Sequence, residues 1–417
     1  MRERLKGKTV VLGLTGGIAC YKAAELTRVL TRAGAVVRVM MSRGAQQFIT
    51  PLTLQTLSGH PVATDTFDLT QESEIGHIRL ADSADVIVIA PATANVIGKI
   101  AAGIGDDLIT TVLLATRAPV VLAPAMNVHM YENPIVQANL DRLRQFGLRI
   151  VEPGEGFLAC GYEGKGRLPD TDVLLAEIER AVTPQDLAGE RVLVTAGPNR
   201  EALDPVRFIS NRSTGKMGFA LAEAAWRRGA EVRLVAGPTA LPTPHGVWRH
   251  DVITAEDMRQ AVLAEAASAT IILMAAAVAD YRPATVAQQK LKKGDGPMVL
   301  ELERTTDILA ELAVRKTTQI LVGFAAETEQ VTANAERKLI AKNLDLIVAN
   351  DVAASNTGFA VDTNAVTIID RDRQHDAIPL SSKGAIADCV LDRVVACRRR
   401  ALESKATASD AQRSSGS

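Results

Sequence analysis

Short apolar runs alternate with longer amphipathic stretches along most of this 417-residue chain. The first forty residues set the pattern, with apolar runs at 10–14 and 36–41 and a helical periodicity over 18–32 between them. Short apolar runs bounded by turn residues are typical of strands that are buried on both faces of a parallel sheet. The pattern therefore predicts an α/β protein.

The alternating pattern occurs twice. The first set of runs ends in an amphipathic helix predicted over 171–182, and a polar, proline-containing linker follows at 183–190. A second set begins at Arg191 and ends in a helix over 383–400. We expect two Rossmann-like three-layer domains with mostly parallel sheets, over 1–186 and 187–402, and a disordered tail over 403–417. The remaining predicted strands are 85–90, 120–123, 149–151, 192–194, 270–277, 320–324, 344–350 and 365–370.

One strand-to-helix connection in the second set is much longer than usual. The segment 195–218, TAGPNREALDPVRFISNRSTGKMG, stands where a nucleotide-binding β–α–β unit has a turn of a few residues. Loops of this length in compact domains are usually functional or disordered. Lysine, serine and threonine at a helix start suit a phosphate or a carboxylate. A plain surface loop with a helix cap at Ser213 or Thr214 is the alternative.

Composition and charge narrow the class of protein. The net charge is −1 and aromatic residues make up 3 %, so nothing favours binding to nucleic acid or to an anionic membrane. No apolar run approaches the roughly 20 residues of a membrane span. The four cysteines lack CxxC spacing, which argues against a disulfide framework or a zinc site and fits a reducing cytoplasm.

Candidate ligand residues follow the predicted strands of the first domain. Gly16 and Gly17 form a turn through which a phosphate can approach the backbone, although the turn is not GxGxxG. Ser42 stands where a dinucleotide fold has an acidic ribose ligand, which favours a mononucleotide such as FMN over NAD. A glycine turn that only packs helix on strand is equally consistent.

Two later strand ends and two isolated residues add candidates to the first domain. Thr93 and Asn95 lie in PATAN, and Met126 and Asn127 lie in PAMN, both at carboxyl ends of predicted strands. Asn127 is alternatively a turn residue. His77 and Cys160 are weaker candidates because each is an isolated residue. His77 precedes a predicted helix and is alternatively a surface histidine. Cys160 lies in a glycine-rich loop, which favours neither a reactive nor an inert thiol.

Charged residues gather in the second domain. Asp280 and Lys290 follow a predicted strand, as a magnesium–nucleotide site requires, and a solvated KLKK run is the alternative. Lys338 and Lys342 are spaced i, i+4 on one helix face, which is alternatively an ordinary polar face.

Taken together, these motifs resemble the bacterial bifunctional phosphopantothenoylcysteine decarboxylase / phosphopantothenate–cysteine ligase family of coenzyme A synthesis. The resemblance covers about residues 6 to 400, and it is carried by TGGIACYK, PATAN, PAMN, LACGYEGKGR, DPVRFISNRSTGKMG, AAVADYRP, KLKK, GFAAET and KNLDLIVAND. Asn199 departs from the threonine usual in the family. The resemblance implies a flavodoxin-like flavoprotein domain followed by a ligase domain.

For the first domain the resemblance implies FMN-dependent oxidative decarboxylation of phosphopantothenoylcysteine to 4′-phosphopantetheine. A β-thiol acid has no electron sink for the carbanion, and oxidation of the thiol provides one. His77 resembles the active-site base, Asn127 the group that holds the substrate carboxylate, and Cys160 the proton donor that serves flavin reoxidation. The implied cofactor-binding residues are Gly16, Gly17, Ile18, Ser42, Pro91, Thr93, Asn95, Ala125 and Met126.

For the second domain the resemblance implies joining of 4′-phosphopantothenate to cysteine through an acyl-cytidylate made from CTP. Lys290 would stabilise charge at the phosphates, Asn211 and Arg207 would hold the acyl part, and Asp280 would bind Mg²⁺. The other implied substrate-binding residues are Ser213, Ala276, Thr306, Asp307, Ile308, Leu309, Phe324, Lys338 and Lys342.

Two other classes of protein fit the sequence less well. A nicotinamide dehydrogenase lacks support because GxGxxG and the ribose carboxylate are missing. A flavin-binding regulatory protein is disfavoured by the presence of His77, Asn127 and Cys160 and of a complete ligase half. The resemblance implies a cytoplasmic homo-oligomer, a dodecamer of flavoprotein trimers joined through ligase dimers.

Overall fold

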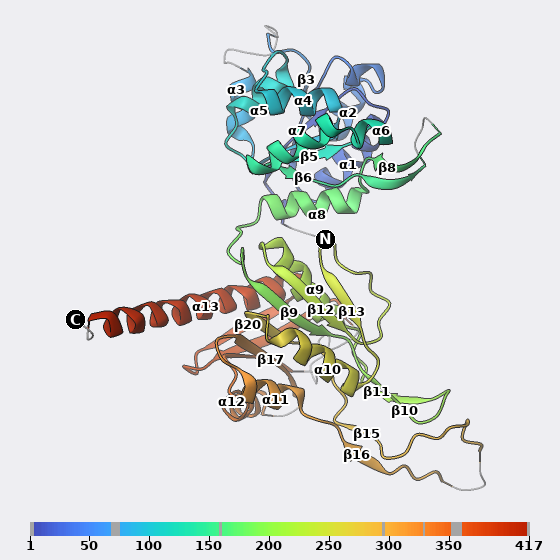
Figure 1. Ribbon diagram of the computed structural model, residues 1–417, viewed down its shortest axis with the longest axis vertical. Coiled ribbons are helices and arrows are strands. Elements are labelled where there is room, and N and C mark those ends of the chain that lie inside the picture. The colour runs from blue at the N-terminus through green and yellow to red at the C-terminus, as the bar shows by residue number, and fades with distance from the viewer. Residues whose placement is uncertain are drawn as a thin grey trace. The chain divides into compact units, whose positions relative to one another are not determined.

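The computed structural model describes residues 4–67, 76–157, 161–293, 297–327, 330–351 and 361–414 (Figure 1). The chain forms two compact units, Met1–Pro184 and Gln185–Ser417, each with its own central sheet. The predicted α/β class with mostly parallel sheets is confirmed.

The first unit is built on a six-stranded parallel sheet in the order β3-β2-β1-β4-β5-β6. Its central strands are almost wholly apolar because helices cover both faces. Side chains of α1, α2 and α8 form the core on one face, and those of α3, α4, α5 and α7 form the core on the other. The elements are β1 (Thr9–Leu14), α1 (Cys20–Arg32), β2 (Val36–Met41), η1 (Ala45–Gln47), α2 (Pro51–Ser58), β3 (Val62–Ala63), α3 (Gly76–Ser83), β4 (Val86–Ala92), α4 (Ala94–Ala102), α5 (Leu108–Ala115), β5 (Val120–Pro124), α6 (Val128–Tyr131), α7 (Pro134–Gln145), β6 (Arg149–Ile150), β7 (Gly154–Phe157), β8 (Glu163–Arg167) and α8 (Thr171–Ala181).

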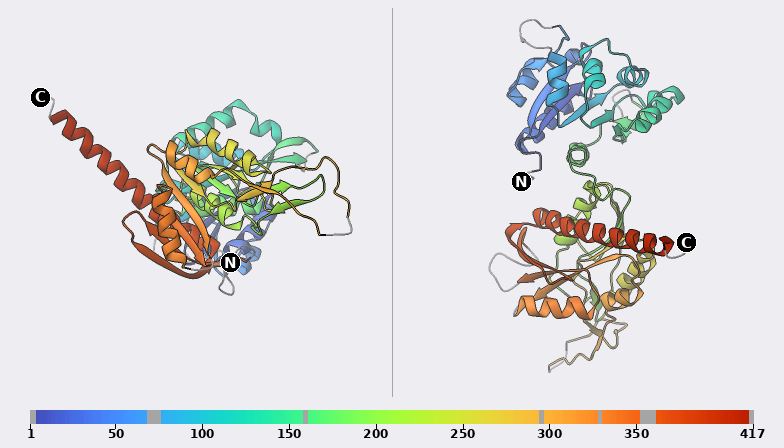
Figure 2. Two further views of the ribbon diagram at one scale, coloured as in Figure 1. Left: turned by 90° about the horizontal axis from the view of Figure 1, so that it is seen from below. Right: turned by 90° about the vertical axis from the view of Figure 1, so that its left-hand side faces the viewer.

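The second unit is built on an eight-stranded sheet in the order β13-β12-β9-β14-β17-β18-β19-β20. Figure 2 shows the long helix near the C-terminus, coloured red, extending from this unit. The strands are parallel up to β18, and β19 and β20 run antiparallel. Helices α10, α11 and α12 pack on one face, and α9 packs with α13. The elements are β9 (Arg191–Ala196), β10 (Arg200–Ala202), β11 (Phe208–Ser210), α9 (Lys216–Arg227), β12 (Glu231–Ala236), β13 (Trp248–Asp251), α10 (Ala255–Ala266), β14 (Ile271–Met274), β15 (Tyr281–Pro283), β16 (Leu302–Arg304), α11 (Ile308–Arg315), β17 (Ile320–Glu327), α12 (Val331–Ala341), β18 (Leu346–Asp351), β19 (Thr363–Asp370), β20 (His375–Ser382) and α13 (Lys383–Ser414).

Two antiparallel arms interrupt the β–α pattern of the second unit. The long connection 195–218 contains the hairpin β10–β11, and the segment after β14 is closed at its base by the pairing of β15 with β16. Figure 1 shows both arms extending away from the central sheet. The expected long loop is therefore an ordered arm rather than irregular chain.

Several predicted boundaries differ from the structure. The glycine-rich segment around 154–167, predicted as a loop, forms the antiparallel hairpin β7–β8, in which Gly156 and Gly164 have φ of 138° and 148°. His77 lies inside α3 rather than before it. The last helix was predicted to end near 400 and disorder to begin at 403, whereas α13 continues to Ser414.

Candidate functional site

A cavity of about 1240 Å³ opens in the first unit at the carboxyl ends of β1, β4 and β5. This is the edge at which open parallel sheets bind ligands. Every predicted cofactor-binding residue except Pro91 lines the cavity, and so does Asn127. The sequence motifs TGG, PATAN and PAMN therefore meet at one site.

The glycine turn after β1 leaves the backbone open to a ligand. A Cβ on Gly16 would lie 3.1 Å from the Cα of Gly44, so the two loops pack backbone against backbone. Glycine favours this approach, because an added Cβ would require the facing backbone to give way by a few tenths of an ångström. The turn therefore has a packing role as well as an open face toward the cavity.

Thr15 joins two of the loops that line this cavity. Its hydroxyl donates to the Pro91 carbonyl oxygen at 2.7 Å and accepts from the Thr93 backbone N–H at 2.9 Å. Pro91 thus supports the cavity wall through Thr15 rather than lining it. Thr15 is the first residue of TGGIACYK but was not among the predicted site residues, although its position directly before Gly16 could have suggested it.

Asn127 combines a capping role with a place in the cavity wall. It is the N-cap of α6, and its Oδ1 accepts from the His129 backbone N–H at 2.9 Å. The neighbouring Met126 donates its backbone N–H to the Gly166 carbonyl oxygen at 3.0 Å, which ties the β7–β8 hairpin to this loop. The alternative interpretation of Asn127 as a turn residue and the predicted site position are therefore both compatible with the structure.

Of the two remaining candidates of the first unit, only His77 lies within the described residues. His77 in α3 is half-buried, and its Nδ1 is buried without a hydrogen-bond partner among the described residues, but His77 does not line the cavity. Cys160 lies outside the described residues.

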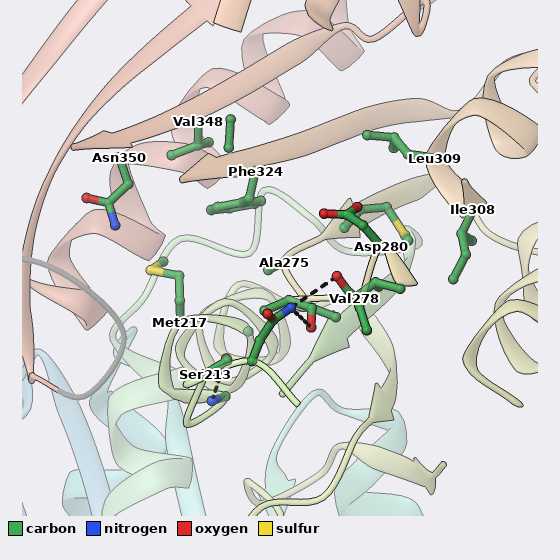
Figure 3. A pocket seen from close by; sticks show the side chains of 18 of the residues that line it. Ser213, Met217, Ala275, Val278, Asp280, Ile308, Leu309, Phe324, Val348 and Asn350 are labelled. Carbon is green, nitrogen blue, oxygen red and sulfur yellow. Dashed lines mark hydrogen bonds between the residues drawn. The ribbon is translucent and has the colours of Figure 1, made fainter. Parts of the chain in front are cut away.

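A second pocket, of about 540 Å³, lies in the second unit at the ends of β14, β17 and β18. Every predicted ligase residue lines it except Arg207 and Lys290. In Figure 3, Asp280, Ile308 and Leu309 lie on one side of the pocket, Met217 and Asn350 lie on the other, and Phe324 lies between them.

Hydrogen bonds fix two parts of this pocket. The Nδ2 of Asn211 donates to the carbonyl oxygens of Ala277 at 3.0 Å and Val278 at 3.1 Å, which holds the segment after β14 against the end of the first arm. Lys342 pairs with Asp307 at 2.8 Å, and Asp307 also caps α11. Burial alone would raise the pKa of Asp307, but the Lys342 ammonium and the Ala310 amide hold it below its usual range.

Arg207 and Lys290 lie on the arms instead. Arg207 donates to Asp204 from Nε at 2.9 Å and to the Leu291 carbonyl oxygen from Nη2 at 2.9 Å. Asp204 is 2 % exposed, and the Arg207 guanidinium together with three backbone N–H groups holds its pKa well below the usual range. Lys290 is exposed next to this link.

The start of α9 lacks the side-chain cap considered for Ser213 or Thr214. Its N-cap is Gly215, with φ of 79° and no capping side chain, and Ser213 accepts from the Gly215 backbone N–H at 3.3 Å. The first turn of α9 faces the pocket.

Five polar pocket residues were not among the candidates from the sequence: Thr305, next to the candidate Thr306, and a set of four others. The four others come from four elements that the fold joins: Lys216, Asn350, Asn364 and Lys383. The chain order gives little signal for this set, because the antiparallel return of β19 brings Asn364 to the end of β18. The lysine within STGKMG and the asparagine within IVAND were the available hints.

The predicted Mg²⁺ site can be compared with the carboxylates that line the second pocket. No group of three or more His, Cys, Asp or Glu side chains suited to a metal ion occurs within the described ranges. Mg²⁺ at a nucleotide site commonly uses one or two carboxylates together with phosphates and water, so Asp280 alone is compatible with it.

Among the helices of the described ranges, none has the length and apolarity needed to cross a membrane.

Family models match both units. The model described as "Flavoprotein" matches residues 1–183, and the model described as "DNA/pantothenate metabolism flavoprotein C-terminal domain" matches residues 187–397. Each model therefore covers the residues that line the pocket of one unit.

Curated relatives match nearly the whole chain. The coenzyme A biosynthesis bifunctional protein CoaBC of Bacillus subtilis is 53 % identical over 96 % of this chain and 99 % of its own length. The protein of the same name from Vibrio cholerae is 50 % identical over 93 % of this chain and 98 % of its own length. The crystal structure of the C-terminal domain of such a protein is 44 % identical, covers 51 % of this chain and 96 % of its own, and superposes with a TM-score of 0.44.

The resemblance inferred from the motifs is thus confirmed, together with the predicted pair of decarboxylase and ligase activities. The chain belongs to the family of bifunctional coenzyme A biosynthesis proteins.

Proposed function

We propose that the first unit binds FMN and decarboxylates phosphopantothenoylcysteine, and that the second unit makes this compound from 4′-phosphopantothenate, cysteine and CTP. The observation that carries the proposal is the convergence of separate motifs on one pocket in each unit. The proposed domains, 1–186 and 187–402, each contain one of these pockets.

The cavity of the first unit fits a flavin mononucleotide. Gly16 and Gly17 leave the backbone open, and Ser42 leaves no carboxylate at the end of β2 to bind a dinucleotide ribose. Bound FMN would supply the two-electron oxidant for the substrate thiol. The residues proposed to hold it are those of the TGG, PATAN and PAMN segments.

Protein side chains would then orient the substrate and move protons. Asn127 is proposed to hold the substrate carboxylate through its amide, since its Oδ1 is already engaged by the His129 backbone. His77 is proposed as the base and Cys160 as the proton donor. Because His77 does not line the cavity of its own chain, its role requires either movement of α3 or a second copy of the chain.

In the second unit we propose that Lys338, Lys342, Phe324 and the start of α11 bind the cytidine nucleotide, with Mg²⁺ held by Asp280. The carboxylate of phosphopantothenate attacks the α-phosphorus of CTP, and pyrophosphate leaves. The cysteine amine then attacks the acyl carbon and releases CMP. Asn211 holds the acyl part, and Lys290 approaches from its arm to stabilise the phosphate charge.

Family membership also supports two broader proposals. We propose that the protein acts in the cytoplasm, since Cys20, Cys389 and Cys397 are free thiols. We also propose that it is a homo-oligomer, a dodecamer in the arrangement that the resemblance implies. Light scattering of the purified protein tests the oligomer directly.

The decisive experiment incubates the purified protein with phosphopantothenate, cysteine and either CTP or ATP. We expect a flavin absorbance spectrum, pyrophosphate release with CTP and formation of 4′-phosphopantetheine. Supplying phosphopantothenoylcysteine alone tests the first unit without the second. A colourless protein that releases pyrophosphate would overturn the flavin assignment only, and a flavoprotein inert toward both nucleotides would overturn the ligase assignment only.

A further inference from the structure

The β7–β8 hairpin, which packs beside α6 (Figure 1), brings to the cavity of the first unit a cation to which the proposed mechanism gives no role. This cation is Arg167, the last residue of β8, which lines the cavity together with its neighbours Gly166 and Leu168. We infer that Arg167 binds the phosphate of phosphopantothenoylcysteine and makes the first unit selective for the phosphorylated substrate. This inference rests on the proposed decarboxylase function and adds to it the residue that recognises the phosphate end of the substrate.

The hairpin gives the Arg167 side chain a defined place. Arg167 pairs in register with Gly154 on β7, and a Cβ on Gly156 would lie 2.9 Å from the Nη1 of Arg167 and 3.6 Å from its Cδ. The guanidinium therefore lies over the bare backbone of Gly156, which has φ of 138°. Glycine at this position leaves room for the guanidinium that a side chain would occupy.

The Arg167 guanidinium is available to a ligand. Its side chain is exposed, and no hydrogen bond or ion pair joins it to another residue of the described ranges. A guanidinium presents its N–H groups in a planar fork that matches two oxygens of a phosphate. An arginine that lines a cavity without a carboxylate partner is therefore suited to an anionic ligand.

The charges around the cavity leave cations for two phosphates. Four cationic and two carboxylate side chains line it: Lys22, Arg43, Lys99, Arg167, Asp106 and Asp107. Both carboxylates pair with Lys99, Asp106 at 2.7 Å and Asp107 at 3.0 Å. The volume of about 1240 Å³ exceeds the ~300–1,000 Å³ of ordinary small-molecule sites, so substrate and FMN fit together. The other three cations are left for the phosphates of these two ligands.

Two of these three cations lie on the wall proposed for the FMN phosphate. Lys22 is in the first turn of α1, which follows the glycine turn. Arg43 directly precedes Gly44, whose backbone packs against Gly16 of that turn. A phosphate bound at the start of α1 would lie beside this wall. Arg167 comes from the hairpin instead, which leaves it for the phosphate of the substrate.

The substrate carboxylate is a poorer ligand for Arg167 than the phosphate is. Its negative charge leaves the oxygens as CO₂ forms, so a bound cation would stabilise the substrate more than the transition state. The neutral amide of Asn127, proposed for this carboxylate, avoids that cost.

The direction of the Arg167 side chain also separates its guanidinium from Asn127. The Gly166 carbonyl oxygen accepts from the Met126 backbone N–H, so the backbone before Arg167 meets the Asn127 loop. The side chain then runs along the hairpin to Gly156. Since the phosphate and the carboxylate are at opposite ends of the substrate, this separation suits a molecule held at both ends.

The test compares phosphopantothenoylcysteine with pantothenoylcysteine, which lacks only the phosphate, as substrates of the full-length protein with bound FMN. For the wild type we expect kcat/KM to be about ten- to hundredfold higher with the phosphorylated substrate, as one charged hydrogen-bonded pair would give. Arg167→Met should remove this preference by raising the KM for the phosphorylated substrate. Arg167→Lys should recover part of it, because an ammonium binds phosphate only as a point charge.

Binding of the product gives a measurement that needs no turnover. In titration calorimetry the wild type should bind 4′-phosphopantetheine about ten- to hundredfold more tightly than pantetheine, and Arg167→Met should bind the two nearly equally. Lys165→Met is the matched control, because Lys165 is also an exposed cation on β8 but does not line the cavity. This control should keep the wild-type preference. The flavin absorbance per protein should be the same in the wild type and in each variant.

Several results would overturn the inference. Equal kcat/KM for the two substrates in the wild type, or an unchanged preference in folded Arg167→Met, would mean that Arg167 does not recognise the phosphate. An equal loss with both substrates would assign Arg167 to the carboxylate, and loss of FMN with the substrate preference retained would assign it to the cofactor. A protein that binds 4′-phosphopantetheine through Arg167 but decarboxylates neither substrate contradicts only the decarboxylase assignment.

Discussion

Arg207 donates from Nη2 to the carbonyl oxygen of Leu291 at 2.9 Å, which links the β10–β11 arm to the segment that carries Lys290. Asp204 completes the link by accepting from the Leu291 backbone N–H at 3.1 Å and from Arg207 at 2.6 Å. Since β15 and β16 pair only at the base of the second arm, this link fixes a point far from that base. The position of Lys290 therefore depends on Asp204 and Arg207.

The first prediction separates an anchoring role of Arg207 from direct substrate contact. We expect Asp204→Asn and Arg207→Met to reduce the rate of pyrophosphate release by similar factors, about tenfold, because either change breaks the same link. Decarboxylation of supplied phosphopantothenoylcysteine should be unchanged. If Arg207 instead binds phosphopantothenate, Arg207→Met alone will raise the KM for that substrate, and Asp204→Asn will be much milder.

The second prediction concerns Lys290 itself. We expect Lys290→Gln to slow formation of the acyl-cytidylate about a hundredfold, which corresponds to about 3 kcal/mol of lost transition-state stabilisation. Lys292→Gln, two residues along the same exposed arm, is the control and should release pyrophosphate at nearly the wild-type rate. Equal rates for the two variants would show that Lys290 has no special role at the phosphates.

Site residues at the ends of buried strands were predictable from the sequence. Gly16, Thr93 and Met126 each come directly after or near such a strand, so the parallel topology alone brings them to one edge. Lys383 could not be found this way, because its position depends on how α13 packs beside α9. The pairing of Arg207 with buried Asp204 on the arm was not predictable for a related reason, because it is a local feature that no periodicity reveals.

The third prediction uses the pH dependence of Tyr131. Burial, together with the hydrogen bond from its hydroxyl to Glu152 at 2.7 Å, raises the pKa of Tyr131 to about 12. Because the folded-state pKa lies above the unfolded value of about 10, this contribution to stability is fully present below pH 10 and is lost as the pH rises through 12. Tyr131→Phe should therefore reduce the alkaline loss of stability in urea unfolding.

Ultraviolet titration gives an independent measurement of the same group. Of the four tyrosines in the chain, Tyr131 should account for the component that ionises near pH 12, and this component should be missing from Tyr131→Phe. An unchanged titration curve above pH 11 would contradict the proposed environment of the Tyr131 hydroxyl.

The last prediction tests whether helix–strand contact positions the start of α9. A Cβ on Gly218 would lie 2.5 Å from the Cβ of Ala196 and 2.7 Å from the carbonyl oxygen of Thr195, both on β9. Neither neighbour can turn away, so Gly218→Ala must shift α9 from the sheet, at a cost of about 1–3 kcal/mol in unfolding free energy. Because the first turn of α9 lines the pocket, pyrophosphate release should slow as well.

Gly98→Ala provides the matched control for this change. Gly98 lies inside α4, and its added Cβ would meet only the Nδ2 of Asn139, at 3.8 Å. Alanine is favoured over glycine by about 0.5–1 kcal/mol within a helix, so this variant should be as stable as the wild type or more stable. Thermal unfolding and the rate of pyrophosphate release of both variants check the prediction. Since both changes add one methyl group to a helix, a Gly218→Ala protein as stable and as active as Gly98→Ala would mean that the β9–α9 contact does not fix the pocket.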